Sequence, residues 1–198
     1  EKKYSNKIFP IEFDLTNREI ISNAIKTINS QEYDINILVN NAAVIHTKLF
    51  QLTKIEEFHE VFNINFFNQI YFVQGILRKI QKTKNGSIIF LSSSAAEDGN
   101  IGRSAYSSSK AALRSFAKVL SRELGSTKIR VNTISPGLTK TDMMFKSTDK
   151  KFLENIVNDI PLKRIGETSD VAKLILFLSS DLSSYITGQD LRIDGGLK

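Results

Sequence analysis

The sequence contains no cysteine, only two histidines and no long apolar run. Without cysteine the chain can form no disulfide, no thiolate metal site and no cysteine nucleophile. His46 and His59 are too few for a histidine-based metal site, so we predict that the chain binds no metal. No apolar run approaches the length of a membrane span, and the first residues, EKKYSNK, lack the apolar core of a signal peptide. These absences predict a cytoplasmic enzyme or binding protein without a membrane partner.

The net charge of +6 is the second bulk property that limits the function. Lysine and arginine are scattered among acidic residues, apart from short groups such as RKIQKTK at 78–84, and no recognition motif accompanies them. We therefore expect no nucleic-acid partner. A basic surface still speeds encounter with anions, so an acidic partner or substrate fits the composition. The cations at the ends of two predicted helices are Lys79, Lys82, Lys84, Lys128 and Arg130.

Short apolar runs alternate with amphipathic helical patterns along the chain. The predicted strands cover 7–13, 36–39, 87–91, 129–134 and 186–194. Strict alternation of strand and helix predicts an α/β fold, a doubly wound, Rossmann-like parallel sheet with helices on both faces. In such a fold the loops after the strands lie along one rim, where ligands bind.

Helical patterns fill the intervals between these strands. The two longest patterns run from about 54 to 80 and from 105 to 124. Thr16 with Glu19, and Thr53 with Glu56, have the spacing of capping boxes and predict where two helices begin. The segment 138–151 is rich in polar residues, and we predict that it forms a mobile lid.

Glycine is missing where a dinucleotide-binding sheet needs it. Such a sheet begins with a strand, a glycine-rich turn and a helix whose N-terminus holds the pyrophosphate. Here the first glycine is Gly75, and no G-x-G-x-x-G occurs. Either the chain is no dinucleotide binder, or it begins partway into the domain.

The stretch SAYSSSKAAL (104–113) places a phenol and an ammonium on one helix face, since Tyr106 and Lys110 are four residues apart. That face continues through apolar residues, namely Leu113, Ala117, Leu120 and Leu124. A lysine on a core-facing stripe costs free energy unless it has a partner, although it can also extend its charge to water. A nearby ammonium would favour the phenolate and make proton exchange useful at neutral pH.

Ser93 and Asn65 are the other candidates for chemistry. Ser93 follows the strand at 87–91 by two residues, so its hydroxyl and the Tyr106 phenol can face one cleft. Asn65 falls within the apolar series of the long helix, so its amide points inward and needs partners. Taken singly, each residue also has a purely structural explanation. Ser93 would be an ordinary loop hydroxyl, and Asn65 would be a core amide with its hydrogen bonds satisfied.

Together, these residues resemble the short-chain dehydrogenase/reductase family. The motifs that carry the resemblance are FDL (13–15), NNAA (40–43), NIN (63–65), SSS (92–94), YSSSK (106–110), SPGLTKT (135–141) and SYITGQDLRIDGG (184–196). Each motif is weak alone, but seven in the family's order and spacing are specific. The C-terminal pattern is most similar to 3-oxoacyl-[acyl-carrier-protein] reductases. Two departures are Ala43, where the family usually has glycine, and Thr139, where it has an aliphatic residue.

The resemblance implies a role for each candidate in catalysis. Tyr106 exchanges the proton with the substrate carbonyl, and Ser93 hydrogen-bonds the carbonyl oxygen. Lys110 lowers the tyrosine pKa and holds the nicotinamide ribose, while Asn65 anchors a water that links the lysine to solvent.

The resemblance also implies a set of cofactor contacts. Asp14 and Leu15 would contact the adenine, and Thr139 and Thr141 would hold the nicotinamide amide and the phosphates. The full set of implied cofactor contacts is Asp14, Leu15, Asn40, Asn41, Ala42, Tyr106, Lys110, Pro136, Gly137, Thr139 and Thr141.

The implied activity is hydride transfer between NADP or NAD and a carbonyl or secondary alcohol, with a 3-oxoacyl-carrier substrate. A sugar, polyol or small-alcohol dehydrogenase is the alternative. A non-catalytic binding protein on this fold is another alternative, which the missing glycine loop favours and the complete set of four catalytic residues opposes. The resemblance further implies a homotetramer and one domain over 1–198. That domain would be N-terminally incomplete, because about 50 residues of β-α-β, including the residue that separates NAD from NADP, are expected before Glu1.

Overall fold

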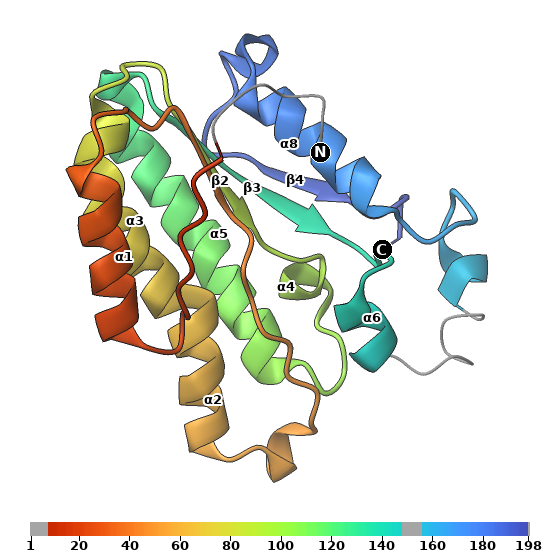
Figure 1. Cartoon of the computed structure of the whole chain (residues 1–198). Helices are drawn as coiled ribbons and strands as arrows, with labels where there is room; N and C mark the ends of the chain where they lie inside the picture. The colour runs from red at the N-terminus through yellow and green to blue at the C-terminus, as the bar shows by residue number, and fades with distance from the viewer. Residues whose placement is uncertain (1–7, 148–155, 198) are drawn as a thin grey trace.

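The computed structural model describes residues 8–147 and 156–197, and a four-stranded parallel sheet lies at its centre (Figure 1). The strands, in their order across the sheet, are β1 (Ile37–Asn40), β2 (Ser87–Leu91), β3 (Arg130–Pro136) and β4 (Asp190–Ile193). All three pairings are parallel. Parallel neighbours need a crossover between them, which is why a helical segment separates each strand from the next.

Helices cover both faces of this sheet (Figure 1). Ile88 and Phe90 of β2 pack with α3 (Asn68–Gln81) and α5 (Ser104–Leu124) on one face. The alternate residues Ile89 and Leu91 pack with α8 (Thr168–Ser179) on the other face. Successive side chains of a strand point to opposite faces, so this central strand is apolar throughout and buried on both sides. The predicted Rossmann-like α/β fold is confirmed.

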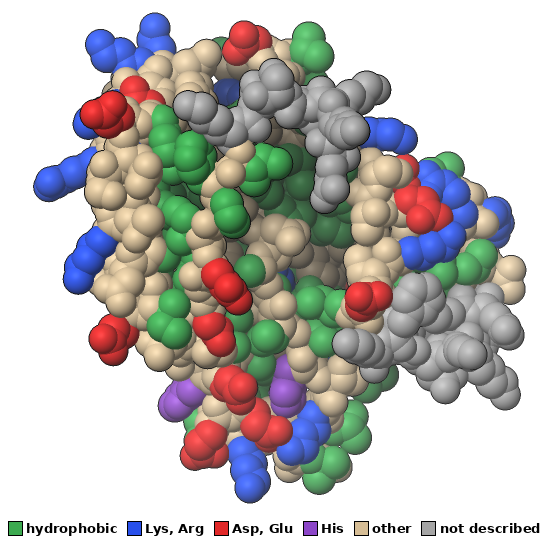
Figure 2. Space-filling model, in the orientation of Figure 1, with side chains coloured by type: hydrophobic (Ala, Val, Ile, Leu, Met, Phe, Trp, Pro, Cys, Tyr) green, Lys and Arg blue, Asp and Glu red, His purple; other side chains and the backbone are tan. Residues whose placement is uncertain are grey.

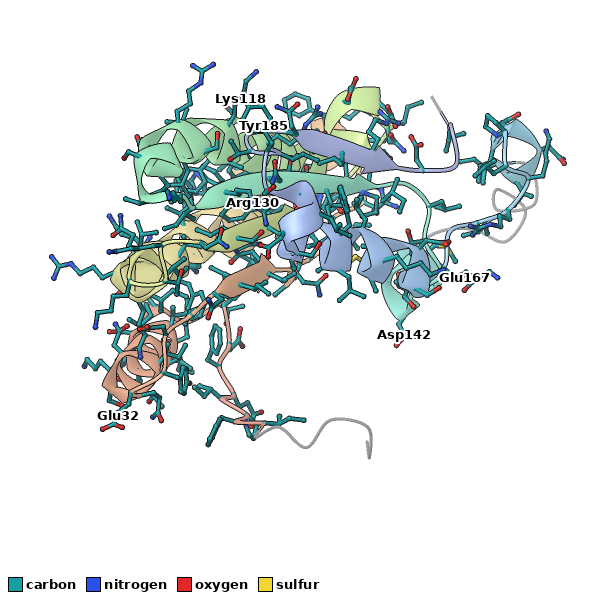
Figure 3. All side chains as sticks on the ribbon, turned by 90° about the horizontal axis from the view of Figure 1, so that it is seen from above. Glu32, Lys118, Arg130, Asp142, Glu167 and Tyr185 are labelled. Atoms are coloured by element: carbon teal, nitrogen blue, oxygen red, sulfur yellow. The ribbon has the colours of Figure 1, made fainter. Side chains whose placement is uncertain are left out.

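The remaining elements are shorter helices and turns, together with α1 (Arg18–Ser30), and they lie around the sheet and the three helices that pack on it. They are α1, η1 (Phe50–Leu52), α2 (Ile55–Phe62), the π-helical turn η2 (Asn63–Phe67), α4 (Ala95–Asp98), η3 (Gly125–Thr127), α6 (Asp142–Ser147) and η4 (Asp181–Ser183). Figure 3 shows Asp142 and Glu167 on the side where the strands end, and Glu32 on the opposite side. No helix within 8–147 or 156–197 has the length and apolarity needed to cross a membrane.

The predicted strand at 7–13 is wrong for the described residues 8–13. This segment has no strand partner in the described chain, and a strand exists only where a neighbour completes its ladder. The edge of the sheet is instead β1, where Ile37 is 47% exposed. The last predicted strand is also shorter than 186–194, because Gly188 has a φ of 71° and the ladder begins only at Asp190.

Both helices begin one residue later than the predicted capping boxes, and neither has a threonine at its cap position. The cap of α1 is Asn17, whose side chain accepts from the N–H groups of Glu19 and Ile20 at 2.9 and 3.3 Å. In α2 the side chain of Glu57 accepts from the N–H of Lys54 at 2.7 Å. The predicted boxes are therefore wrong. Asn17 alone caps α1, because residue 20 is isoleucine, and Glu57 provides the acceptor in α2.

The predicted lid at 138–151 is partly helical. Residues 142–147 form α6, whereas 148–151 lie outside the described residues. The helix predicted over 54–80 consists of α2, the π-helical turn η2 and α3.

Candidate active site

Ser93 lies at the carboxyl end of β2, in the loop that leads into α4. The next residue, Ser94, donates its backbone N–H to the carbonyl of Pro136 at 2.9 Å, so the link to β3 continues beyond the last residue of β2. The Ser93 hydroxyl accepts from the N–H of Ala95 at 3.2 Å. The sheet and the first turn of α4 therefore fix Ser93 from both sides.

Tyr106 is buried in the first turn of α5 and faces Ser93. Burial raises the pKa of the Tyr106 phenol above its usual value. A side-chain hydrogen bond with Ser93 and the charge of Arg103 act in the opposite direction and lower that pKa. Because burial is the largest of these effects, the phenol is protonated at neutral pH and can donate its proton.

Lys110 is only 2% exposed, so the alternative in which it extends its charge to water is wrong. Its Nζ donates to the carbonyl oxygen of Leu91 at 2.7 Å and lies 6.0 Å from the centre of the Tyr106 ring. Burial lowers the pKa of the Lys110 ammonium from 10.5 to about 8. The side chain therefore places its amino group beside the tyrosine within the core. That group carries a positive charge below pH 8 and becomes neutral at higher pH.

Asn65 lies in the π-helical turn η2 and is fully buried. Its Oδ1 accepts from the N–H of Val44 at 2.8 Å, and its Nδ2 donates to the carbonyl of Val44 at 2.9 Å. The same Nδ2 donates to the hydroxyl of Ser109 at 3.1 Å, and Ser109 donates to the carbonyl of Tyr106 at 2.7 Å. The predicted inward-facing amide therefore joins the segment after β1 to the helix that carries Tyr106.

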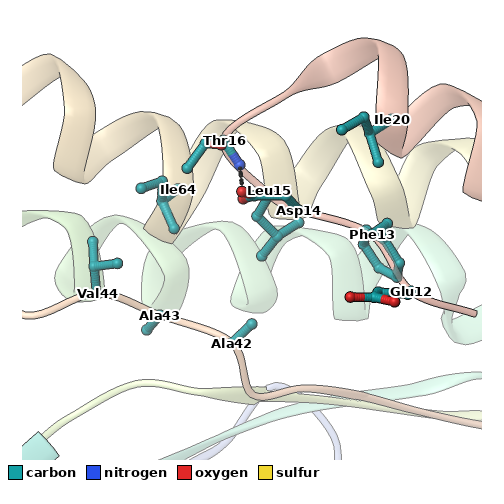
Figure 4. A pocket seen from close by; sticks show the side chains of 10 residues that line it. All are labelled: Glu12, Phe13, Asp14, Leu15, Thr16, Ile20, Ala42, Ala43, Val44 and Ile64. Carbon is teal, nitrogen blue, oxygen red and sulfur yellow. Dashed lines mark hydrogen bonds between the residues drawn. The ribbon is translucent and has the colours of Figure 1, made fainter.

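A pocket of about 580 Å³ lies next to Asn65, because Ile64 and Val44, the hydrogen-bond partner of Asn65, line it (Figure 4). Ser93, Tyr106 and Lys110 are not among its lining residues. Its lining residues are Glu12, Phe13, Asp14, Leu15, Thr16, Ile20, Ala42, Ala43, Val44 and Ile64. The face seen in Figure 2 is hollowed at its centre, and hydrophobic side chains line the hollow. The volume of the pocket lies within the range of small-molecule sites.

Of the residues predicted to contact a cofactor, Asp14, Leu15 and Ala42 line this pocket. Asp14 accepts from the N–H of Thr16 at 2.8 Å, and this hydrogen bond lowers the pKa of its carboxyl group. Asn41 is exposed and does not line the pocket.

Two buried amide atoms near the pocket have no hydrogen-bond partner among the described residues. They are Nδ2 of Asn40, at the end of β1, and Oε1 of Gln69, whose Nε2 donates to Ala42 at 2.7 Å. Buried polar atoms are normally paired, so an unpaired donor and an unpaired acceptor indicate room for a water or a ligand group.

The predicted segment 136–141 follows β3 at the same rim. Gly137 donates its N–H to Ile193 of β4 at 3.0 Å and packs against the next residue, since an added Cβ would lie 2.5 Å from the Cβ of Asp194. The hydroxyl of Thr139 donates to the carbonyl of Gly137 at 3.1 Å, and the hydroxyl of Thr141 accepts from the N–H of Met144 at 3.2 Å. The two hydroxyls are therefore bonded within their own turn, and the backbone around Thr139 is held by Gly166.

Sequence reasoning missed two buried residues of this region, Ser109 and Gln69. Ser109 connects Asn65 to Tyr106, and Gln69 holds Ala42. The available signal was helical spacing, since Ser109 follows Tyr106 by three residues and Gln69 follows Asn65 by four. No described group of three His, Asp or Glu side chains has an arrangement that could hold a metal ion.

Comparison with known proteins places this arrangement in a family. A family model described as "Enoyl-(Acyl carrier protein) reductase" matches residues 1–198. A 3-oxoacyl-[acyl-carrier-protein] reductase of Aquifex aeolicus is 36% identical over 198 residues, which cover 98% of this chain and 78% of that protein. The corresponding reductase of Thermotoga maritima is 37% identical over 191 residues, covering 96% and 77%.

A solved structure gives the same result. A short-chain type dehydrogenase/reductase from Mycobacterium ulcerans matches with a TM-score of 0.86 and 28% identity, over 93% of this chain and 68% of that chain. The chain belongs to the short-chain dehydrogenase/reductase family. This membership confirms the predicted family and the predicted class, an NAD(P)-dependent oxidoreductase acting on carbonyl or CH–OH groups, similar to 3-oxoacyl-[acyl-carrier-protein] reductases.

Proposed function

We propose that this short-chain dehydrogenase/reductase reduces the 3-oxo group of an acyl chain carried by an acyl-carrier protein. The observation that carries the proposal is the convergence of the Ser93 hydroxyl, the Tyr106 phenol and the buried Lys110 at the carboxyl end of β2. This set supplies a hydrogen-bond donor, a proton donor and a positive charge to one carbonyl oxygen.

Each residue has one task in this proposal. Tyr106 gives its proton to the carbonyl oxygen, and Ser93 hydrogen-bonds the same oxygen while negative charge develops on it. Lys110 stabilises the phenolate that remains, because it approaches the ring from the core side. Asn65 holds Val44 in place and, through Ser109, also the first turn of α5. Its role in the family is to anchor a water that links the lysine to solvent.

The residues of the pocket fit a nicotinamide dinucleotide. Its adenosine half would lie against Asp14, Leu15 and Ala42, where the unpaired Nδ2 of Asn40 supports a polar ligand. The residues proposed for the other half, with Tyr106 and Lys110, are Pro136, Gly137, Thr139 and Thr141. When bound, the nicotinamide supplies or accepts the hydride. NADP and NAD both fit these residues.

The carrier-linked substrate is proposed from the names of the relatives and from the charge of the chain. Both reductases described above are named for a 3-oxoacyl-[acyl-carrier-protein] substrate. An acidic carrier suits a protein with a net charge of +6. We further propose that residues 1–198 belong to a single catalytic domain, and that the protein is a homotetramer with a cytoplasmic location. Neither a nucleic acid nor a membrane is part of the proposal.

The test compares substrates on the purified protein with NADPH and with NADH. The loss of reduced-nicotinamide absorbance is followed with a 3-oxoacyl-carrier substrate, a small uncharged ketone and, in the reverse direction, a sugar or polyol. We expect the highest kcat/KM with the carrier-linked substrate. A higher value for the small ketone or the polyol would favour the small-alcohol dehydrogenase. Absence of turnover with every substrate, in protein that binds cofactor, would favour the non-catalytic alternative.

A further inference from the structure

Two consecutive amide side chains at the start of α3 are bonded to the main chain on both sides of the pocket. Nδ2 of Asn68 donates to the carbonyl oxygen of Leu15 at 2.6 Å. Nε2 of Gln69 donates to the carbonyl oxygen of Ala42 at 2.7 Å. Leu15 precedes α1 and Ala42 follows β1, so one turn of helix contacts two segments that are distant in sequence.

These two segments are the walls of the pocket. Figure 4 shows residues 12–16 on one side and residues 42–44 on the other, with Ile64 on the helix behind them. Among the described residues, no hydrogen bond joins the two walls directly. Their separation therefore depends on the helix that binds both.

Asn68 is itself held in place from the other side. Nε of Arg18, in the first turn of α1, donates to Oδ1 of Asn68 at 3.2 Å. The Arg18 guanidinium also lies 5.6 Å from the centre of the Tyr71 ring. Both atoms of the Asn68 amide are thus used, and its orientation is fixed by partners on α1 and on the wall.

If these two positions served only to fill the core, buried amides would be a costly choice, because each polar atom needs a hydrogen-bond partner. Asn68 and Gln69 are each 3% exposed, and Oε1 of Gln69 has no partner among the described residues. A leucine or methionine of similar size would remove that unpaired acceptor without loss of volume. The amides are explained better by the geometry that they impose on the two walls.

We propose that Asn68 and Gln69 are positioning residues that set the spacing of the pocket walls and, through it, the affinity for the adenine-bearing half of the cofactor. This inference rests on the proposed function, because it takes the pocket to be the adenosine site. Neither residue needs to touch the ligand. Loss of one amide should loosen one wall and leave the residues around Tyr106 unchanged.

The experiment measures the binding of AMP and of nicotinamide mononucleotide, the two halves of the cofactor, by calorimetry on the protein without substrate. The variants are Asn68→Leu, Gln69→Met and, as a milder change that spares the buried amides, Arg18→Met. The matched control is Asn29→Leu, because Nδ2 of Asn29 also donates to a backbone carbonyl between α1 and α3, that of Gly75 at 2.9 Å, away from the pocket.

We expect Asn68→Leu and Gln69→Met to weaken AMP binding roughly tenfold, the equivalent of one or two hydrogen bonds, and Arg18→Met to weaken it about threefold. Binding of nicotinamide mononucleotide should stay unchanged in all of them, and the control should keep both affinities. Two results would overturn this inference and leave the proposed function intact. One is an unchanged affinity for AMP in Asn68→Leu and Gln69→Met, and the other is an equal loss of affinity for AMP and for nicotinamide mononucleotide. A wild-type protein that binds neither half would overturn the proposed function as well.

Discussion

Nζ of Lys110 donates to the carbonyl oxygen of Leu91 at 2.7 Å, so the last residue of β2 holds a buried ammonium next to the Tyr106 ring. An ammonium has three N–H donors, and within 8–147 and 156–197 only this one is engaged. The bond to the strand orients the side chain, and the other donors stay available to the tyrosine and to a ligand hydroxyl. Lys110 is therefore fixed by the fold before any ligand binds.

Burial of Lys110 predicts a pH-dependent stability. The pKa of its ammonium is about 8 in the folded protein against 10.5 for the free side chain. Between these values the unfolded chain binds more protons than the folded one, so the free energy of unfolding rises with pH, by up to about 3 kcal/mol in total. Below pH 8 both states are protonated and this contribution stays constant.

The measurement is urea unfolding of the ligand-free wild type and of Lys110→Met at several pH values from 7 to 10. Lys110 also influences the neighbouring Tyr106 phenol, so the same comparison in a Tyr106→Phe background isolates the contribution of Lys110 to the difference in unfolding free energy. It should grow in favour of the wild type above pH 8. A difference that is independent of pH would show that the ammonium is not desolvated.

Tyr106→Phe should reduce kcat by about 10²- to 10⁴-fold, because the phenol supplies the proton to the carbonyl oxygen. Cofactor affinity should stay nearly unchanged, since the ring remains. The matched control is Tyr185→Phe, which removes the hydroxyl of a fully exposed tyrosine and should keep wild-type kcat. A Tyr106→Phe variant with more than about a tenth of wild-type kcat would contradict the role of Tyr106.

Gly137→Ala should destabilise the protein by about 1–3 kcal/mol through overpacking. The added Cβ would lie 2.5 Å from the Cβ and 2.9 Å from the Cα of Asp194, and neither atom is the end of a flexible side chain. Gly125→Ala is the control, because Gly125 has helical backbone angles and nothing within 4 Å of the added atom. Thermal unfolding should show a lower Tm for Gly137→Ala and an equal or higher Tm for Gly125→Ala. Equal melting of Gly137→Ala and wild type would mean that the segment at 137 moves away from β4 without cost.

The central sheet could be predicted because its strands are apolar on both faces. Ile88, Ile89 and Phe90 form a continuous buried run, which only a strand between two helical layers accommodates. The edges could not be predicted in the same way. Residues 8–13 are also mostly apolar, although Pro10 and Glu12 interrupt them, and hydrophobic pattern alone does not provide the neighbour that a strand needs.

The candidate site shows a similar division. The spacing of Tyr106 and Lys110 predicted that both lie on one apolar helix face, since helical periodicity fixes which residues share a face. It left open whether the lysine extends its charge to water, and the structure shows that both side chains are buried. The partners of Asn65 could not be predicted, because Val44 and Ser109 lie 21 and 44 residues away in sequence. The π-helical turn that carries Asn65 has no signature in the hydrophobic pattern.

The protein should be a homotetramer in which the helices at about 54–80 and 105–124 pair with their copies and the last strand meets another subunit. Large apolar side chains exposed on these elements support this arrangement, including Phe67 at 47% and Val119 at 53%. Light scattering at micromolar concentration should give four times the chain mass. Val119→Asp should lower that mass, and a monomeric wild type would contradict the prediction.

Two of the basic residues predicted at helix ends are buried, so they are not available to an acidic carrier. Lys79 is buried and donates to the carbonyl oxygens of Gln31 and Tyr33, and Arg130 is buried and donates to Ser183 at 2.9 Å. Neither can therefore belong to a basic surface. The exposed remainder, Lys82, Lys84 and Lys128, precedes β2 and β3, at the end of the strands opposite to Tyr106.

Steering of an acidic carrier should therefore come from the net charge of the whole protein and be weak at moderate salt, since the Debye length is about 10 Å at 0.1 M. We expect kcat/KM for a carrier-linked 3-oxoacyl substrate to fall markedly between low and moderate salt, while kcat/KM for a small uncharged ketone hardly changes. Lys84→Glu should reduce the low-salt value for the carrier only slightly, because Lys84 is remote from Tyr106 within one subunit. A large loss in that variant would mean that Lys84 borders the active site of a neighbouring subunit. If the carrier-linked substrate reacts no better than the ketone at low salt, the protein is a dehydrogenase of sugars or small alcohols.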